Sequence, residues 1–127
     1  MHPVQIGWGL LSVGVGSALG GMARWGLSVW LNARHPTFFW GTFVANALGG
    51  LLIGMAVAWF ARDPDISHEL RLFLITGFLG GLTTFSTYSS EVIGLIQRGE
   101  PGWATLVAVS HLAISLLLTA LGYWLVK

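Results

Sequence analysis

The hydrophobic residues of this chain fall into four long blocks separated by charged residues. No Asp, Glu, Lys or Arg occurs in residues 1–23, 35–61, 72–90 or 101–126. About 20 apolar residues in a helix cross the ~30 Å hydrocarbon core of a bilayer, and each block can supply such a helix. The expected fold is an all-α integral membrane protein with four transmembrane helices, over about residues 4–31, 41–61, 68–98 and 103–126.

The third block contains a segment that is unlike an ordinary membrane helix. Residues 77–91, GFLGGLTTFSTYSSE, hold three glycines and seven hydroxyl side chains. Lipid offers no hydrogen-bond partners, so such a segment is tolerated only where it faces protein, a cavity or an ion. We therefore expect a broken third helix, with one piece over about 68–79 and another over about 86–98. A functional site is expected at the break.

The composition supports a membrane protein of one domain. Charged residues make up 9% of the chain and hydrophobic residues 54%, and the mean hydropathy is +0.74. A soluble domain carries roughly a quarter charged residues. Four spans use most of the 127 residues, so we expect a single transmembrane channel domain over 1–127, surrounded by membrane lipid.

The same composition argues against several other classes of protein. The absence of cysteine from the sequence excludes thiolate metal sites and cysteine nucleophiles. There is no basic cluster that could bind nucleic acid. The four histidines are scattered and form no catalytic spacing with Ser, Asp or Glu, so an enzyme is not expected.

The charged residues between the blocks bear on the orientation of the chain in the membrane. An even number of spans places both chain ends on one side, together with Arg62, Arg71 and Lys127. Arg34 and Arg98 would lie on the opposite side. A balance of three against two is too weak to fix one orientation. Insertion in both orientations is therefore plausible, and it would permit an antiparallel homodimer.

Three motifs make the chain resemble the CrcB/Fluc family of fluoride-specific ion channels over nearly its whole length. They are Gly20-Gly21-x-x-Arg24-Trp25, Gly41-Thr42-x-x-x-Asn46 and the block 77–91, of which the last is highly specific. The resemblance implies passive export of fluoride, which lowers its cytoplasmic concentration and toxicity. It also implies a dual-topology antiparallel homodimer in a bacterial inner membrane.

The resemblance further implies a structural sodium ion that is not transported. Backbone carbonyls of Gly80 and Thr83 from both subunits would hold this ion at the break. Without the resemblance, an ordinary glycine kink resealed by Ser and Thr side chains would be the simpler interpretation.

Phe85 and Tyr88 are the aromatic candidates for the fluoride path. They are three residues apart and so share a helix face, where their positive ring edges could meet an anion. The spacing alone favours simple packing, whereas the flanking hydroxyls and the break favour the anion. Both positions are usually Phe in the family, so the exact role of Tyr88 stays open. The other residues expected along the path are Thr84, Ser86, Thr87, Asn46, His111, Ser115 and Thr119.

The polar residues of the second and fourth helices have structural alternatives. The resemblance implies that Asn46 supplies an N–H donor for the anion, although an amide at this depth is more often a link between helices. His111, Ser115 and Thr119 recur every four residues and share one face. Hydroxyls of Ser and Thr often bond back to their own helix, but the row of three favours a pore-lining track.

Arg24 and Glu91 are the charged residues expected at an aqueous vestibule. Snorkelling toward the interface is a fair alternative for Arg24, whereas the resemblance implies that it draws in anions. An intramembrane carboxylate such as Glu91 is a functional candidate by default, paired with His111 or with a hydroxyl. Glu91 and His111 also keep a rival function open, which is proton-coupled export of fluoride or of a small molecule. A non-transporting assembly protein is a third possibility, against which the polar track argues.

Overall fold

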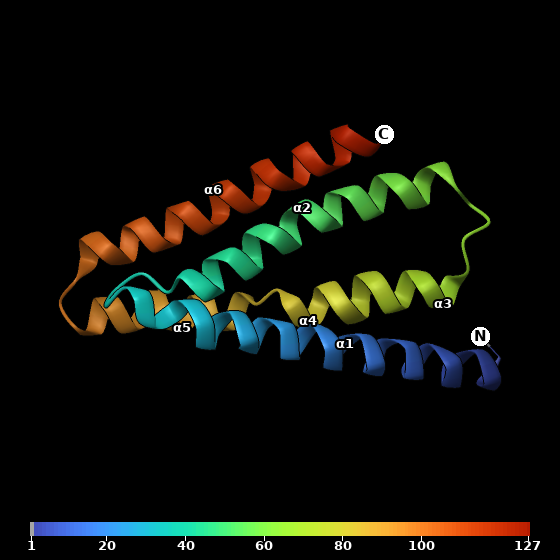
Figure 1. The fold of residues 1–127 in the computed structure, drawn as a ribbon, viewed down its shortest axis with the longest axis horizontal. Helices are drawn as coiled ribbons and strands as arrows, with labels where there is room; N and C mark the ends of the chain where they lie inside the picture. Colours follow the sequence, from blue (N-terminus) through green and yellow to red (C-terminus); the bar gives the residue numbers. More distant parts are fainter. Residues whose placement is uncertain (1) are drawn as a thin grey trace.

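A computed structural model of the chain describes residues 2–127, which form four long helical spans joined by short loops (Figure 1). Each span is long and apolar enough to cross a membrane, so the predicted all-helical, four-span fold is confirmed. Both described ends of the chain lie at the same end of the bundle (Figure 1), as an even number of spans requires. The spans are Pro3–Arg34, Trp40–Arg62, His68–Gln97 and Pro101–Val126.

Sequence signals explain where the helices begin and end. Pro101 starts the fourth span as its first helical residue, two residues before the predicted start. Ser67 caps the start of the third span, because its hydroxyl accepts a hydrogen bond of 3.2 Å from the backbone N–H of Leu70. Gly99, with φ of 75°, makes the turn into the fourth span. The elements are α1 (Pro3–Leu31), the 3₁₀ helix η1 (Asn32–Arg34), α2 (Trp40–Arg62), α3 (His68–Arg71), the π-helix η2 (Leu72–Leu79), α4 (Gly80–Leu82), α5 (Phe85–Gln97) and α6 (Pro101–Val126).

The third span changes its backbone geometry along its length. The π-helical turns of η2, which are wider than those of an α-helix, were not foreseen from the sequence. α4 follows, and then Thr83 and Thr84 are extended, with ψ of 155° and 119°. The Thr84 hydroxyl accepts a hydrogen bond of 3.0 Å from the N–H of Thr87 and so caps α5.

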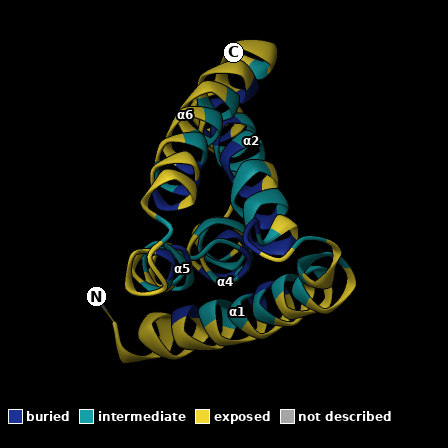
Figure 2. Ribbon diagram, turned by 90° about the vertical axis from the view of Figure 1, so that its left-hand side faces the viewer, coloured by how far each residue is buried: buried dark blue, intermediate teal, exposed yellow. Residues whose placement is uncertain are grey.

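The helices pack as two close pairs (Figure 2). α1 runs along η2 and α4, α2 runs along α6, and α5 also contacts α6. Glycine allows both close approaches, because a Cβ atom at Gly54 or at Gly20 would overlap the backbone of the facing helix. The glycine spacings Gly16/Gly20 and Gly50/Gly54 therefore have a packing role. It extends to Gly77 and Gly81, where a Cβ atom would also meet the backbone of α1.

Candidate functional site

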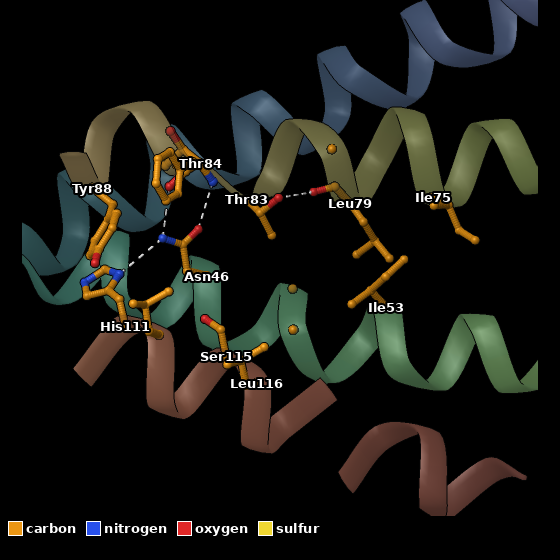
Figure 3. A pocket seen from close by; sticks show the side chains of 15 residues that line it. Asn46, Ile53, Ile75, Leu79, Thr83, Thr84, Tyr88, His111, Ser115 and Leu116 are labelled. Atoms are coloured by element: carbon orange, nitrogen blue, oxygen red, sulfur yellow. Dashed lines mark hydrogen bonds between the residues drawn. The ribbon is translucent and has the colours of Figure 1, made fainter. Parts of the chain in front are cut away.

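A cavity of about 390 Å³ lies between α2, α6 and the third span (Figure 3). One end is lined by polar side chains and the other by apolar ones, so polar side chains would meet a small polar species at the first end. The polar end is formed by Asn46, Thr84, Tyr88, His111 and Ser115. The apolar end is formed by Ile53, Ile75 and Leu79.

The side chain of Asn46 pairs with the extended backbone of Thr84. Its Oδ1 accepts a bond of 2.8 Å from the Thr84 N–H, and its Nδ2 donates a bond of 3.1 Å to the Thr84 carbonyl oxygen. A backbone that leaves the helix needs such partners in a dry bundle. Asn46 is thus a link between α2 and the segment that joins α4 to α5, which is the alternative that the sequence left open.

His111 completes this cluster from α6. Its Nδ1 lies 3.2 Å from Nδ2 of Asn46, and only 4% of the residue is exposed. The ring packs against Tyr88 at 4.8 Å between ring centroids and meets Phe43 edge-on at 5.3 Å. The imidazole is therefore held in place by aromatic rings from α2 and α5.

Phe85 and Tyr88 lie close together but differ in their surroundings. Their ring centroids are 5.5 Å apart, yet Phe85 is 74% exposed and Tyr88 only 8%. The Tyr88 hydroxyl donates a bond of 2.8 Å to the carbonyl oxygen of Ala108 on α6. The Tyr88 hydroxyl thus ties α5 to α6, whereas the ring of Phe85 is largely exposed.

The row of polar residues on α6 is not uniform. His111 and Ser115 line the cavity, but Thr119 lies outside its lining. The single O–H of Thr119 is shared between two carbonyl acceptors, that of Gly50 at 2.9 Å and that of Ser115 at 2.8 Å. Thr119 therefore fastens α6 to α2 beside their glycine contact.

The hydroxyls around the extended residues also differ in their roles. Thr83 Oγ1 donates to the carbonyl oxygen of Leu79 at 2.8 Å, and Thr84 Oγ1 lies 3.3 Å from Oγ of Ser86. Ser86 is exposed, and neither Ser86 nor Thr87 lines the cavity. Of the three Ser and Thr residues of the third span that were expected along the path, Thr84, Ser86 and Thr87, only Thr84 lines the cavity.

Arg24 reaches from α1 to the end of α4. Its Nε donates a bond of 3.1 Å to the carbonyl oxygen of Gly81. The N–H of Phe85, four residues on, would be the partner of this carbonyl in an unbroken helix, but α4 ends at Leu82. A cation is favoured at the negative end of a helix. Arg24 thus supports this segment from α1, whereas Asn46 supports it from α2.

Glu91 is bound to a hydroxyl, which was one of its two predicted partners. Thr42 Oγ1 donates a bond of 2.7 Å to Oε2 of Glu91. Oε1 of Glu91 is buried and has no hydrogen-bond partner among residues 2–127. Thr42 stands one helical turn before Asn46, so its position on the same face of α2 was the signal that could have identified it.

Gly80 and Thr83 were expected to turn their carbonyls toward an ion. Within residues 2–127, no hydrogen bond reaches the carbonyl oxygen of either residue, since the N–H of Thr84 bonds to Asn46 instead. Gly80 has helical angles, φ −62° and ψ −38°, and a Cβ atom there would have its nearest contact 3.7 Å away, at the Ile75 oxygen. Neither the backbone nor the packing of the protomer therefore requires glycine at position 80.

Comparison with known proteins identifies the family. Residues 11–123 match the family model described as CrcB-like protein, Camphor Resistance (CrcB). The chain belongs to the CrcB family. The resemblance found in the three sequence motifs is thereby confirmed.

Several members of this family are similar to the chain over most of its length. It is 54% identical over 116 residues to the protein named fluoride-specific ion channel FluC of Cupriavidus pinatubonensis, an alignment that covers 91% of this chain and 92% of that protein. It is 50% identical over 117 residues to the FluC of Thiobacillus denitrificans, which covers 92% of this chain and 94% of that one. For the FluC of Ralstonia pickettii the identity is 51% over 121 residues, or 95% and 96% of the two chains.

Proposed function

We propose that this CrcB family member is a fluoride-specific ion channel that passively exports fluoride and so lowers its cytoplasmic concentration. The observation that carries this proposal is the identity of 50–54% with proteins named fluoride-specific ion channels, over nine-tenths of both chains. These relatives are named as channels and not as enzymes. A protein with four membrane spans fits a multi-pass location, and we place it in a bacterial inner membrane.

The polar end of the cavity supports an anion path. Fluoride is small and strongly hydrated, so it leaves water only where many small donors replace its hydration shell. Ser115 and Phe85 line the cavity, and no side-chain hydrogen bond engages Ser115 Oγ among residues 2–127. Both are therefore available to a permeating anion.

We propose that the working unit is a dual-topology antiparallel homodimer with a broken third helix. Phe85, Ser86 and Ser90 are exposed on α5 at membrane depth, where lipid would leave the two hydroxyls poorly satisfied. A second copy that covers this face would shield them and seat the ring of Phe85.

The chain has no cysteine, so a cysteine at the exposed Gly102 reports orientation. Labelling of every molecule from one side only would reject the antiparallel dimer.

The carbonyl oxygens of Gly80 and Thr83 fit a structural sodium ion shared by two subunits. They lack donors within residues 2–127, and an uncharged oxygen cage suits a hard cation. Such an ion would compensate backbone dipoles and stabilise the dimer by linkage without being transported. The test is to exchange sodium for a large organic cation. Undiminished dimer stability and fluoride flux after this exchange would reject the sodium site.

Ion efflux from liposomes tests the proposed function directly. Liposomes that contain the purified chain are loaded with potassium fluoride or potassium chloride, and a potassium ionophore lets the cation leave with the anion so that charge stays balanced. They should release fluoride rapidly and retain chloride. Protein-free liposomes are the control for leakage of hydrogen fluoride. Equal efflux of the two anions would contradict a fluoride-specific channel.

A proton-coupled exporter is the second candidate, and one observation favours it. Oε1 of Glu91 is buried without a partner among residues 2–127, and an intramembrane carboxylate of this kind is a common proton carrier. A channel moves charge without protons. If a pH gradient drives fluoride uphill at zero voltage, the exporter replaces the channel.

A further inference from the structure

The backbone of Thr84 fixes the orientation of the Asn46 amide. The oxygen and nitrogen of an amide side chain are distinguished by their hydrogen-bond partners. The Thr84 N–H can only donate and its carbonyl can only accept, so Oδ1 of Asn46 must face the first and Nδ2 the second. A flipped amide would oppose donor to donor and acceptor to acceptor.

This orientation in turn fixes the proton of His111. The Nδ2 group of Asn46 has two hydrogens and no acceptor capacity. One hydrogen is directed at the Thr84 carbonyl oxygen, and the other faces Nδ1 of His111 at 3.2 Å. Nδ1 must then accept, so the ring carries its single proton on Nε2 while this contact holds.

Nε2 is the free donor of the cluster. Figure 3 shows this second ring nitrogen of His111 on the side turned away from Asn46. Among residues 2–127, Oε1 of Glu91 is the one side-chain polar atom that is both buried and without a hydrogen-bond partner. Nε2 of His111 has no hydrogen-bond partner either. It is therefore not fully buried and retains access to open space. Both hydrogens of the Asn46 amide, in contrast, are already directed at protein acceptors.

We propose that Asn46 is a positioning residue that transmits the backbone geometry of Thr84 to His111, and that the Nε2–H of His111 is the N–H donor to fluoride at the polar end of the cavity. This assignment rests on the proposed function. In this assignment Asn46 determines which nitrogen of His111 carries the proton. The anion is contacted by the imidazole of His111, which Tyr88 and Phe43 hold in place.

Nitrogen-15 spectra of the histidine-labelled full chain in liposomes test the tautomer without any transport. A His111→Gln sample identifies the His111 signals among the four histidines. The wild-type chain should show an unprotonated Nδ1 and a protonated Nε2. A proton on Nδ1, alone or on both nitrogens, would overturn the proposal. Because the wild-type spectrum decides this point, the test does not depend on any variant folding.

Asn46→Asp and Ser115→Ala form the matched pair. The carboxylate of the first keeps an acceptor for the Thr84 N–H but places an acceptor against Nδ1. The proton should therefore appear on Nδ1. Ser115→Ala removes a hydroxyl from the same cavity and should leave the tautomer unchanged. An unchanged tautomer in Asn46→Asp would show that Asn46 does not set it.

Anion titration and flux test the donor role separately. Sodium fluoride should shift the Nε2–H resonance of His111, whereas sodium chloride at the same concentration should not. His111→Leu should lower fluoride flux about tenfold, as expected for one hydrogen bond to a charged group. His111→Gln, whose amide can accept from Asn46 and still donate onward, should retain most of it. An unshifted resonance would reject the donor role even with the expected tautomer, whereas absence of selective flux from the wild-type chain would reject the proposed function itself.

Discussion

Where α2 meets α6, two backbones approach closely because side chains are absent, whereas between α4 and α5 the backbone is held by side chains that come from other helices. The first contact needs glycine at Gly54 and Gly122, each of which faces the backbone of the other helix. The second needs Asn46 from α2 and Arg24 from α1, which together bind backbone groups of Gly81 and Thr84.

The difference lies in what each region does with its backbone hydrogen bonds. At the α2–α6 contact both helices keep the backbone hydrogen bonds within themselves, so the contact adds only packing and the Thr119 hydroxyl bond. Around Thr83 and Thr84 the helical hydrogen bonds of the third span stop, and each missing backbone hydrogen bond must be replaced within a dry bundle. Packing of the first kind builds the bundle, and replacement of the second kind leaves a polar end in the cavity.

The largest expected effect comes from filling the first contact. Gly54→Ala places a methyl group against the Thr119 carbonyl of α6, which cannot move without shifting the helix. We expect a loss of about 3 kcal/mol in the free energy of unfolding, typical of severe overpacking. The measurement is thermal unfolding in detergent. Gly94→Ala is the control, because a Cβ atom there has no neighbour within 4 Å in the described part of the chain. Equal stability of the two variants would contradict the close α2–α6 contact.

Most of the bundle could be predicted because it depends on local signals. Charge-free blocks locate the spans, and the spacing of Gly50 and Gly54 indicates a close contact without naming the facing helix. The π-helical turns of η2 could not be predicted. The bonds that close such a turn depend on how the whole third span is held against α1, and no residue type within Leu72–Leu79 requires it.

The next largest effect concerns support of the second region from α1. Arg24→Met keeps an unbranched apolar stem but removes the guanidinium that bonds to the Gly81 carbonyl. We expect a loss of about 2 kcal/mol in stability, the usual range for a hydrogen bond with a charged partner. Arg34→Met is the control, because among residues 2–127 Arg34 bonds only to Trp30, which lies in the same span, and it is exposed. If Arg24→Met is as stable as the control and only slows fluoride entry, Arg24 acts at a vestibule, as the family resemblance implied.

The residues of the candidate site could be named from the sequence, but their partners could not. Asn46 and Thr84 are 38 residues apart, and Arg24 and Gly81 are 57 apart, so no helical spacing connects them. For Thr119 a spacing exists but does not identify the partner. Its four-residue spacing from Ser115 predicts a shared helix face, but not that its hydroxyl bonds to α2. The homodimer, the sodium ion and the fluoride path itself stay predictions.

A smaller effect is expected at Phe85, which belongs to neither contact within the protomer. The side chain is 74% exposed, so Phe85→Ile should leave the folding of the protomer intact. An aliphatic side chain of similar bulk lacks the positive ring edge. We expect fluoride flux to fall about tenfold, equal to roughly 1.4 kcal/mol on the barrier. Tyr88→Phe is the comparison and should lose little flux, because its hydroxyl serves Ala108. Unchanged flux in Phe85→Ile would mean that the ring only packs.

The smallest expected effect separates two neighbours on α6 that the sequence placed in one track. Thr119→Val replaces a hydroxyl that bonds to the Gly50 and Ser115 carbonyls, so it should lower stability by about 1 kcal/mol. Because Thr119 lies outside the cavity lining, its fluoride flux should stay normal. Ser115→Ala should do the opposite, since Ser115 lines the cavity and its hydroxyl holds no helix. Thermal unfolding and liposome efflux are measured on both variants. Thr119→Val should show lowered stability and normal flux, and Ser115→Ala should show normal stability and lowered flux. A loss of flux in Thr119→Val at full stability would instead place Thr119 on the path and restore the uniform track.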